Sequence, residues 1–486
     1  MRKLFSILLS ALMLISLLSL CVSAAGDVVT ITKSGGSKKN YTSFEDAVAE
    51  LADGDTLTFT ADTSGDVAID ASSKTVVIDG DGRTLSGTVY ILAEGGNITV
   101  KNLKLDASSA TTDALTIVAA SNDAHGTVKF DGVTITTASG KKGIVAGGNH
   151  KVTVSSSSIV AGSTALQHVD DNPIELTVEF TYIETSVGYC FYGRKNSTYT
   201  FDSCEFKKNG TSTYAAIQCG GAADGTGSVT TLNNCTVNSE NKQCFSVLAY
   251  QTYIVNGGTY NAVNNFACIY AEGNGAHLKI TDGTFTCTGV ANSQYDCSVV
   301  AIGSKDGTAL LEIGGGTFTY TGGEIAGSAV IAGYKYSGTT GTVKITGGTF
   351  KSNSTLPVID TVSGSELTLE DATMVNEGSN TIPAYSIVKN DTRTDYPFDA
   401  GSKILYIGGG AAAVTTGSTV ITTPQQTTAS EGTSPSPAGT GDDTTPNPTT
   451  GDNAPLLKYV IIAVAVAAIA ALTVGVIIPG SKKNRA

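Results

Sequence analysis

A short polar segment near the middle of the chain holds the residue types that could do chemistry. Asp170 and Asp171 are adjacent carboxylates, His168 precedes them, and Arg194 follows about one repeat later. Adjacent carboxylates can bind Ca²⁺, or can act as acid and base on a glycosidic bond. The alternative, which we favour, is a polar turn whose Asp and Asn172 side chains bond to the backbone. Asp170, Asp171 and Arg194 therefore remain candidates. We predict no metal site and no cofactor, with Ca²⁺ as the one ion that these carboxylates would suit.

The cysteines are a second group of reactive side chains. Eight of the nine lie between Cys190 and Cys297, and none has the Cys-x-x-Cys spacing of a metal site. An exported chain can form disulfides, but a free cysteine is also a small side chain that is readily buried. Buried thiols are the favoured interpretation, and disulfides stay open. Cys204 and Cys235 occupy equivalent places in neighbouring repeats and should therefore lie side by side.

The elements that position these residues come from a repeat. Each unit has two short strands around a polar turn, and an apolar residue before the turn recurs every 23 to 33 residues. A second apolar column follows five positions later, so that period-two alternation places both columns on one face. The first column is Val100, Phe130, Val154, Val178, Phe201, Leu232, Val255, Ile280, Ile313, Ile345 and Leu369. The second is Leu105, Ile135, Ile159, Ile183, Phe206, Val237, Tyr260, Phe285, Phe318, Phe350 and Met374.

A third short strand closes most units, as at 114–118, 143–146, 215–219, 268–271 and 329–332. Three strands in about 24 residues predict an all-β parallel β-helix solenoid of about eleven or more coils over residues 26–410. No single coil can bury its apolar face, whereas stacked coils share one core. An array of β-sandwiches would instead show hairpin turns every 8–12 residues.

The start of this region has a capping element. Residues 42–51 read as a short helix with Thr42 or Ser43 as its N-cap. The turn at Asp53 to Asp55 and the segment from Val76 to Leu85 follow. These features resemble the N-terminal cap of the pectin-lyase-like right-handed β-helix superfamily, over about residues 27–410. The resemblance implies a right-handed solenoid.

Enzymes of that superfamily include polysaccharide lyases and glycoside hydrolases, but their motifs are missing from this chain. Trp is absent, which rules out the Trp-Ile-Asp-His motif, and there is no Gly-His-Gly and no Asn-Thr-Asp with paired aspartates. Fold alone does not imply activity. We therefore do not expect an enzyme; if the chain is one, a polysaccharide lyase or a glycoside hydrolase is implied.

The N-terminus has the parts of a secretory signal peptide over residues 1–25. Arg2 and Lys3 precede an apolar run, and small residues allow cleavage around Ala24 and Ala25. Cys21 raises a lipoprotein alternative, which Leu20 disfavours because that pathway requires a small residue there.

The C-terminal part predicts a stalk and an anchor. Residues 411–446 are rich in Thr, Pro, Ser and Gly and should form a disordered stalk that crosses the cell wall. Residues 459–479 carry no charge and are long enough for a transmembrane helix. The basic tail that follows predicts a cytoplasmic C-terminus for the membrane-inserted precursor.

A short motif precedes this helix. Asn447, Pro448, Thr449, Thr450 and Gly451 resemble a sortase sorting signal, which comprises residues 447–486 with the helix and tail. The resemblance implies sortase as a partner, cleavage between Thr450 and Gly451, and attachment to cell-wall peptidoglycan. Asn447 replaces the Leu of the commonest version, which leaves the sortase class open.

The remaining observations concern partners. The net charge is −13, and no basic stretch lies outside the two ends, so nucleic acid is not an expected ligand. Outward threonines form a ladder from Thr236 to Thr373, which resembles an ice-binding face but is better explained by strand propensity. Tyrosines concentrate in the middle coils, where Tyr182 should point outward and Tyr253 inward. We expect an extracellular, wall-anchored adhesin or glycan-binding protein; an enzyme or a purely structural wall protein are the alternatives.

Overall fold

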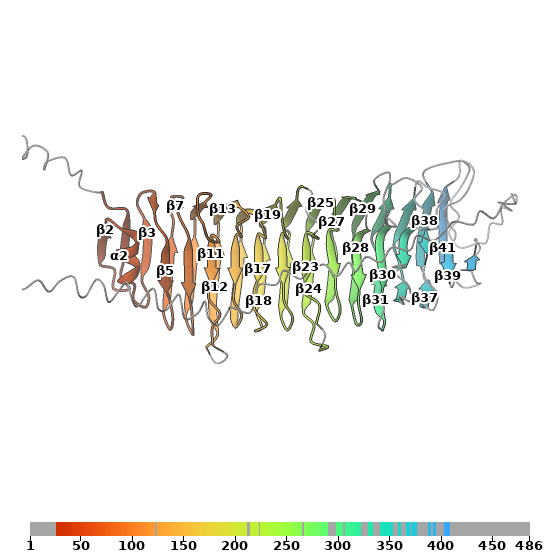
Figure 1. The fold of residues 1–486 in the computed structure, drawn as a ribbon, viewed down its shortest axis with the longest axis horizontal. Helices are drawn as coiled ribbons and strands as arrows, with labels where there is room; N and C mark the ends of the chain where they lie inside the picture. Colours follow the sequence, from red (N-terminus) through yellow and green to blue (C-terminus); the bar gives the residue numbers. More distant parts are fainter. Residues whose placement is uncertain are drawn as a thin grey trace, which may run out of the picture. The chain divides into compact units, whose positions relative to one another are not determined.

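The computed structural model describes residues 26–408, apart from residues 122–123, 211–213, 223, 265–266, 290–297, 305–306, 322–328, 334–340, 353–357, 361–365, 370, 377–386, 390–391 and 395–402. In this part of the chain the regular structure is almost all β-strand. The strands form a 27-stranded sheet and a 14-stranded sheet, and nearly all neighbours are parallel (Figure 1). The predicted repeat architecture, with parallel strands stacked coil upon coil as in a β-helix, is confirmed.

Each coil contributes three strands in a fixed order. The first strands are β3 Thr56–Phe59, β6 Thr75–Asp79, β9 Asn97–Lys101, β12 Gly126–Asp131, β15 His150–Ser155, β18 Glu175–Glu179, β21 Thr198–Asp202, β24 Val229–Asn233, β31 Ala309–Ile313, β34 Gly341–Ile345 and β37 Glu366–Leu369. The second strands are β4 Thr63–Ser64, β7 Thr84–Ser86, β10 Lys104–Ala107, β13 Thr134–Ser139, β16 Ser158–Gly162, β19 Tyr182–Thr185, β22 Glu205–Lys208, β25 Thr236–Glu240, β32 Thr317–Tyr320, β35 Thr349–Ser352, β38 Asp371–Asn376 and β41 Lys403–Gly408. Two long strands, β27 Thr252–Asn264 and β29 His277–Gly289, continue through the turn, so that each supplies both the first and the second strand of its coil.

The third strands form the second sheet. They are β5 Val67–Asp70, β8 Val89–Leu92, β11 Leu115–Ile117, β14 Ile144–Ala146, β17 Leu166–His168, β20 Phe191–Gly193, β23 Ile217–Cys219, β26 Phe245–Val247, β28 Ala267–Glu272, β30 Ser298–Gly303, β33 Ala329–Gly333, β36 Ile359–Asp360 and β39 Ile387–Lys389. The last of these pairs antiparallel with β40 Thr392–Thr394.

The sharp turn between the first and second strands depends on one residue in the left-handed region. Asn102, Gly132, Ser156 and Asn234 fill this position in four coils, with φ between 50° and 64°. Asn and Gly tolerate this backbone conformation better than other residues do. The turn keeps the register, so Phe130 pairs with Val154 and Ile135 with Ile159.

The core lies inside the coils. The described members of both predicted apolar columns, Val100 to Ile345 and Leu105 to Phe350, are at most 2% exposed. Aromatic rings stack along the second column, with centroids of Phe285 and Phe318 4.7 Å apart and those of Phe318 and Phe350 5.0 Å apart. Stacked coils thus bury one continuous apolar column, as the repeat predicts.

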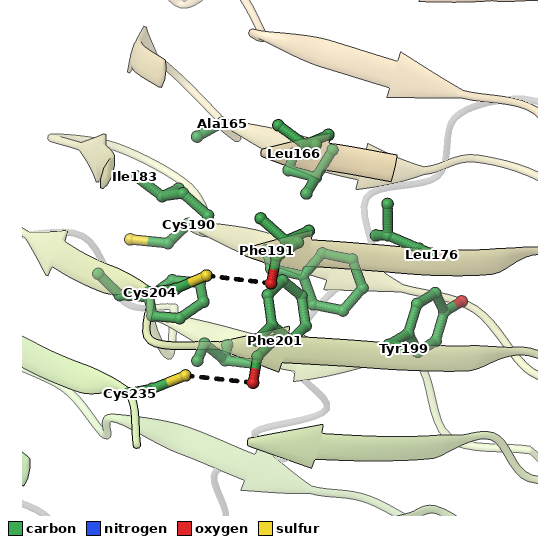
Figure 2. Close-up of a cluster of buried hydrophobic side chains, with 14 of the residues drawn as sticks. Ala165, Leu166, Leu176, Ile183, Cys190, Phe191, Tyr199, Phe201, Cys204 and Cys235 are labelled. Carbon is green, nitrogen blue, oxygen red and sulfur yellow. Dashed lines mark hydrogen bonds between the residues drawn. The ribbon is translucent and has the colours of Figure 1, made fainter. Parts of the chain in front are cut away.

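The cysteines belong to this core. All seven described cysteines are buried free thiols, in agreement with the favoured interpretation, and Cys297 lies outside the described residues. Cys204 and Cys235 occupy equivalent turn positions, and their thiols donate to the carbonyl oxygens of Val178 and Phe201, at 3.3 and 3.5 Å (Figure 2). Burial raises the pKa of the Cys190 thiol to about 12, which disfavours the reactive thiolate.

The N-terminal end departs from the parallel pattern. β1 Val29–Thr32 pairs antiparallel with both β2 Lys38–Tyr41 and β3, and the sequence did not predict this hairpin. The helix α2, Phe44–Ala49, follows with Ser43 as its N-cap. Phe44 packs on Phe59 with ring centroids 4.8 Å apart, so α2 joins the core at the first coil.

Several predicted segments lie outside the described residues. They are the signal peptide with Ala24 and Ala25, the stalk at 411–446, and the sorting signal from Asn447 to Gly451 with its apolar helix at 459–479. Among the residues that the structure does describe, no helix is long and apolar enough to cross a membrane.

Candidate functional site

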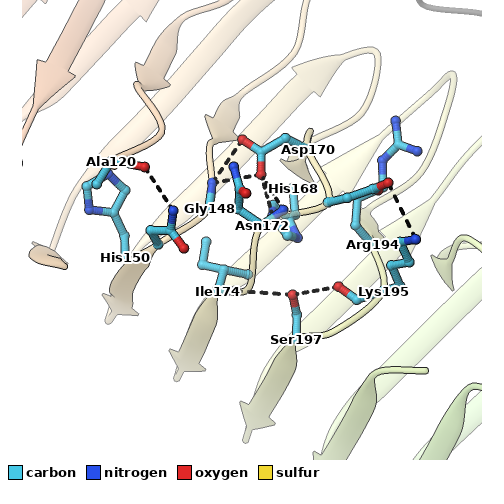
Figure 3. A network of polar contacts seen from close by, with 12 residues as sticks. Ala120, Gly148, His150, His168, Asp170, Asn172, Ile174, Arg194, Lys195 and Ser197 are labelled. Carbon is cyan, nitrogen blue, oxygen red and sulfur yellow. Dashed lines mark hydrogen bonds and ion pairs between the residues drawn. The ribbon is translucent and has the colours of Figure 1, made fainter. Parts of the chain in front are cut away.

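Asp170 lies just after β17, in the loop that leads to β18 (Figure 3). Its carboxylate accepts hydrogen bonds from the backbone amides of Gly148, at 3.1 and 3.2 Å, and Asn172, at 3.0 Å. A Cβ at Gly148 would lie 2.3 Å from the carbonyl oxygen of Asn172, so the close approach of the two loops requires glycine. Asp170 therefore ties its own loop to the preceding coil.

His168 extends this network into the core. Its Nδ1 lies 2.8 Å from the hydroxyl of Tyr199, and its Nε2 lies 3.5 Å from Oδ1 of Asp170. The Tyr199 hydroxyl also donates to the carbonyl oxygen of Arg194 and accepts from its amide. Because a hydroxyl has one proton, this arrangement makes His168 Nδ1 a donor to Tyr199. Both rings are at most 1% exposed, so neither can reach a substrate.

Asp171 belongs to a separate cluster at the surface. The ammonium of Lys195 lies 2.8 Å from Asp224 and 3.8 Å from Asp171, which come from neighbouring coils. The hydrogen bond with Asp224, followed by the nearby carboxylate charges, raises the pKa of Lys195. Lys195 therefore stays protonated near neutral pH and does not supply a base.

The side chain of Arg194 lies in a third environment, a cluster of tyrosines. Its guanidinium lies over the ring of Tyr192, 5.7 Å from the centroid. Tyr192 packs on Tyr189, which packs on Tyr214, with centroids 4.8 Å apart in both pairs. Tyr189 and Tyr192 are less than 10% exposed, so these rings are not open faces for a ligand.

The three sequence candidates thus have three different surroundings. Burial opposes ionisation of Asp170, but the neighbouring His168 and the hydrogen bonds from the amides of Gly148 and Asn172 outweigh it and lower the pKa of the carboxyl group. A general acid would need the opposite shift. Within the described ranges, no group of three or more His, Cys, Asp or Glu side chains could hold a metal ion.

A different feature, which sequence reasoning missed, lies at the turn between β18 and β19. Phe180 fills the left-handed position with φ 48°, and its side chain is 66% exposed. Neighbouring coils place Ser156 and Ser203 there, both with φ near 50°. The signal in the sequence is the bulky residue between Glu179 and Thr181, where the repeat otherwise has a small or polar turn residue.

Comparison of the chain with protein-family models, with curated proteins and with solved structures found no match. The geometry of the described residues therefore carries the functional argument.

Proposed function

We propose that this chain is a wall-anchored adhesin that binds glycans on the outer face of a right-handed, pectin-lyase-like parallel β-helix. The observation that carries the proposal is the regular outer face of the second strands. Outward side chains there stay in register from coil to coil, as in the pairs Thr236–Thr259 and Thr284–Thr317. Ladders of this kind present hydroxyl and amide groups at the strand spacing of about 4.8 Å.

Amide ladders support the same proposal. Asn261 donates to Asn238 at 3.0 Å, and Asn256 donates to Asn233 at 2.9 Å, each pair spanning two neighbouring coils. Such groups can exchange hydrogen bonds with the hydroxyls of a polysaccharide. A repeating protein surface suits a repeating polymer, because each additional coil can contact a further sugar.

Anchoring completes the proposal. The motif from Asn447 to Gly451, with an apolar run and a basic tail behind it, supports export, a membrane-inserted precursor, and transfer by sortase to peptidoglycan. The stalk at 411–446 would hold the solenoid away from the wall.

A wall-anchored polysaccharide lyase or glycoside hydrolase is the second candidate. The exposed cluster of Asp171, Lys195 and Asp224 is the feature that favours it, since it combines two carboxylates with a cation. Its Lys195 is held in ion pairs, and Asp170 bonds to backbone amides, so we rank this candidate below glycan binding. A structural wall protein without a ligand is the third.

One experiment separates the three candidates. The full chain, in a detergent without a sugar headgroup, is incubated with plant, mucin and bacterial wall polysaccharides, with and without Ca²⁺. Size-exclusion chromatography then follows protein and polymer together. Co-elution with intact polymer is the expected result. Shortened polymer would instead support the enzyme. If the polymer neither co-elutes with the protein nor becomes shorter, both the glycan-binding proposal and the enzyme proposal are contradicted.

A further inference from the structure

Phe180 has an unfavourable backbone conformation and an unfavourable exposure at the same time. A bulky side chain is rare in the left-handed region, and few large apolar side chains among the described residues are exposed to this degree. Strained residues persist where the surrounding structure enforces them, and they cluster at functional sites. The fold itself does not require a ring here, since Ser and Asn serve in the same position of other coils.

A second aromatic residue lies two positions further along the same coil. Tyr182 starts β19, and it pairs with Ser158 on one side and with Glu205 on the other. Ile183 is buried in the core, so its strand neighbour Tyr182 lies on the outer face, two residues after the exposed turn residue Phe180. Val160, which is 36% exposed, pairs with Glu184 and adds an exposed apolar side chain to the same outer face, two positions further along the preceding coil. We call Phe180, Tyr182 and Val160 the aromatic ledge.

The ledge has a polar border that is held in place. The hydroxyl of Tyr182 donates to Glu184, and the amide of Asn209 donates to the same carboxylate. Lys207 lies 3.5 Å from Glu184. The result is a set of oriented donors and acceptors beside apolar rings.

The chemistry of this surface identifies an occupant. A sugar ring has an apolar face that packs on aromatic side chains and a rim of hydroxyls that need hydrogen bonds. Glu179, Glu184 and Glu205 surround the ledge with negative charge, and Lys207 offsets one of them. Acidic glycans would therefore be repelled, and the ledge is smaller than the roughly 800 Å² per partner of a stable protein interface.

We propose that the aromatic ledge is a binding site for a neutral glycan chain lying along β19. The proposal rests on the proposed function and deepens it, because it names one site and excludes acidic polymers from it. Hydroxyls on the rim of the sugar would bond to Glu184 and Asn209, and the rings of Phe180 and Tyr182 would support its apolar face.

The test is calorimetric titration of the full chain, in a detergent without a sugar headgroup, with cellohexaose, xylohexaose, mannohexaose and hexagalacturonate. The double variant Phe180→Asn, Tyr182→Thr replaces both rings with residues found at the same positions of other coils, so it should fold. The matched control is Val263→Asn, which removes another exposed apolar side chain, 49% exposed, in a later coil.

We expect at least one neutral hexasaccharide to bind, no binding of hexagalacturonate, and an affinity loss of about tenfold or more in the double variant. The control should bind as the native chain does. Equal binding by the native chain and the double variant would contradict the aromatic ledge as the binding site. It would still be consistent with glycan binding elsewhere on the protein. Preference for hexagalacturonate would also overturn the ledge. No binding of any probe would count against both the ledge and the proposed function.

Discussion

The side-chain ammonium of Lys208 donates a hydrogen bond of 2.7 Å to the carbonyl oxygen of Gly188, inside the stack of coils. Lys208 is fully buried, and this burial lowers its pKa to about 8. One carbonyl oxygen does not replace the hydration of a charged group. We therefore expect Lys208→Met to stabilise the chain at pH 7, by roughly 2–3 kcal/mol, in chemical unfolding.

The pH dependence gives a control for this prediction. The pKa of Lys208 is lower in the folded state, so the unfolded state binds more protons above about pH 8, and native stability should rise with pH there. Lys208→Met should not show this rise in stability with pH. The difference in unfolding free energy between the variant and the native chain should therefore be smaller at pH 9.5 than at pH 7. Lys129→Met, at an exposed position of β12, should change stability little at either pH. If the difference in unfolding free energy between Lys208→Met and the native chain is the same at both pH values, burial of the ammonium is contradicted.

Phe180 gives a prediction about stability that is separate from binding. Phe180→Asn should raise the unfolding free energy by about 1 kcal/mol, because Asn tolerates the left-handed region better than Phe does. The reciprocal change, Asn234→Phe, places the same strain in another coil, where φ is 50°. It should lower stability by a similar amount. Paired urea unfolding curves test both, and a loss of stability in Phe180→Asn would show that the exposed ring supports the fold.

Asp170 and Asp171 should differ in their contributions to stability, although they are neighbours in the sequence. Asp170→Asn weakens bonds to two backbone amides and should lower stability by about 1–3 kcal/mol. Asp171→Asn, in an exposed ion pair, should have an effect below about 0.5 kcal/mol. The pKa of Asp170 is lowered in the folded state, so its contribution is present above about pH 4 and lost as the pH falls further. Thermal unfolding at pH 7 and pH 3 would measure this; equal effects of the two variants would exclude the structural role of Asp170.

The thiols should be unreactive until the chain unfolds. Burial raises the pKa of Cys219 as well as that of Cys190, and thiol reagents need an accessible thiolate. In a chain with Cys21→Ser and Cys297→Ser, an aromatic disulfide reagent at pH 8 should label no cysteine under native conditions. It should label all seven remaining cysteines in urea. Rapid labelling of the folded chain would contradict the closed core.

The sequence predicted the apolar columns because period-two alternation recurs in every unit around a turn of fixed length. Phe130 and Ile135 illustrate this, since their spacing alone indicates that both side chains are buried. The hairpin of β1 and β2 escaped prediction for the opposite reason. The β2 segment from Lys38 to Asn40 is exposed throughout, so it has no alternation, and its pairing depends on contacts rather than on pattern.

The candidate site was predictable only in part. The sequence indicates a polar turn at Asp170, and the structure has one. The partner amide of Gly148, however, is 22 residues away, and pairing across coils depends on the length of each loop. The separation of Asp171 and Arg194 into an ion cluster and an aromatic cluster follows from the same loops. Phe180 was missed because nothing in its type suggests a left-handed turn.

The short strand β2 at the N-terminal edge of the sheet has a consequence for how separate molecules meet. A parallel stack that ended on an open strand would offer its backbone amides and carbonyls to the next molecule, as fibrils do. Here the sheet ends on β2, a strand of four residues that bears Lys38 and Lys39 and is exposed from Lys38 to Asn40. Another copy that approached this edge would find only a short strand with two lysine side chains, and short, lysine-bearing edge strands disfavour pairing between sheets. The fold thus disfavours head-to-tail polymerisation of the chain at this end.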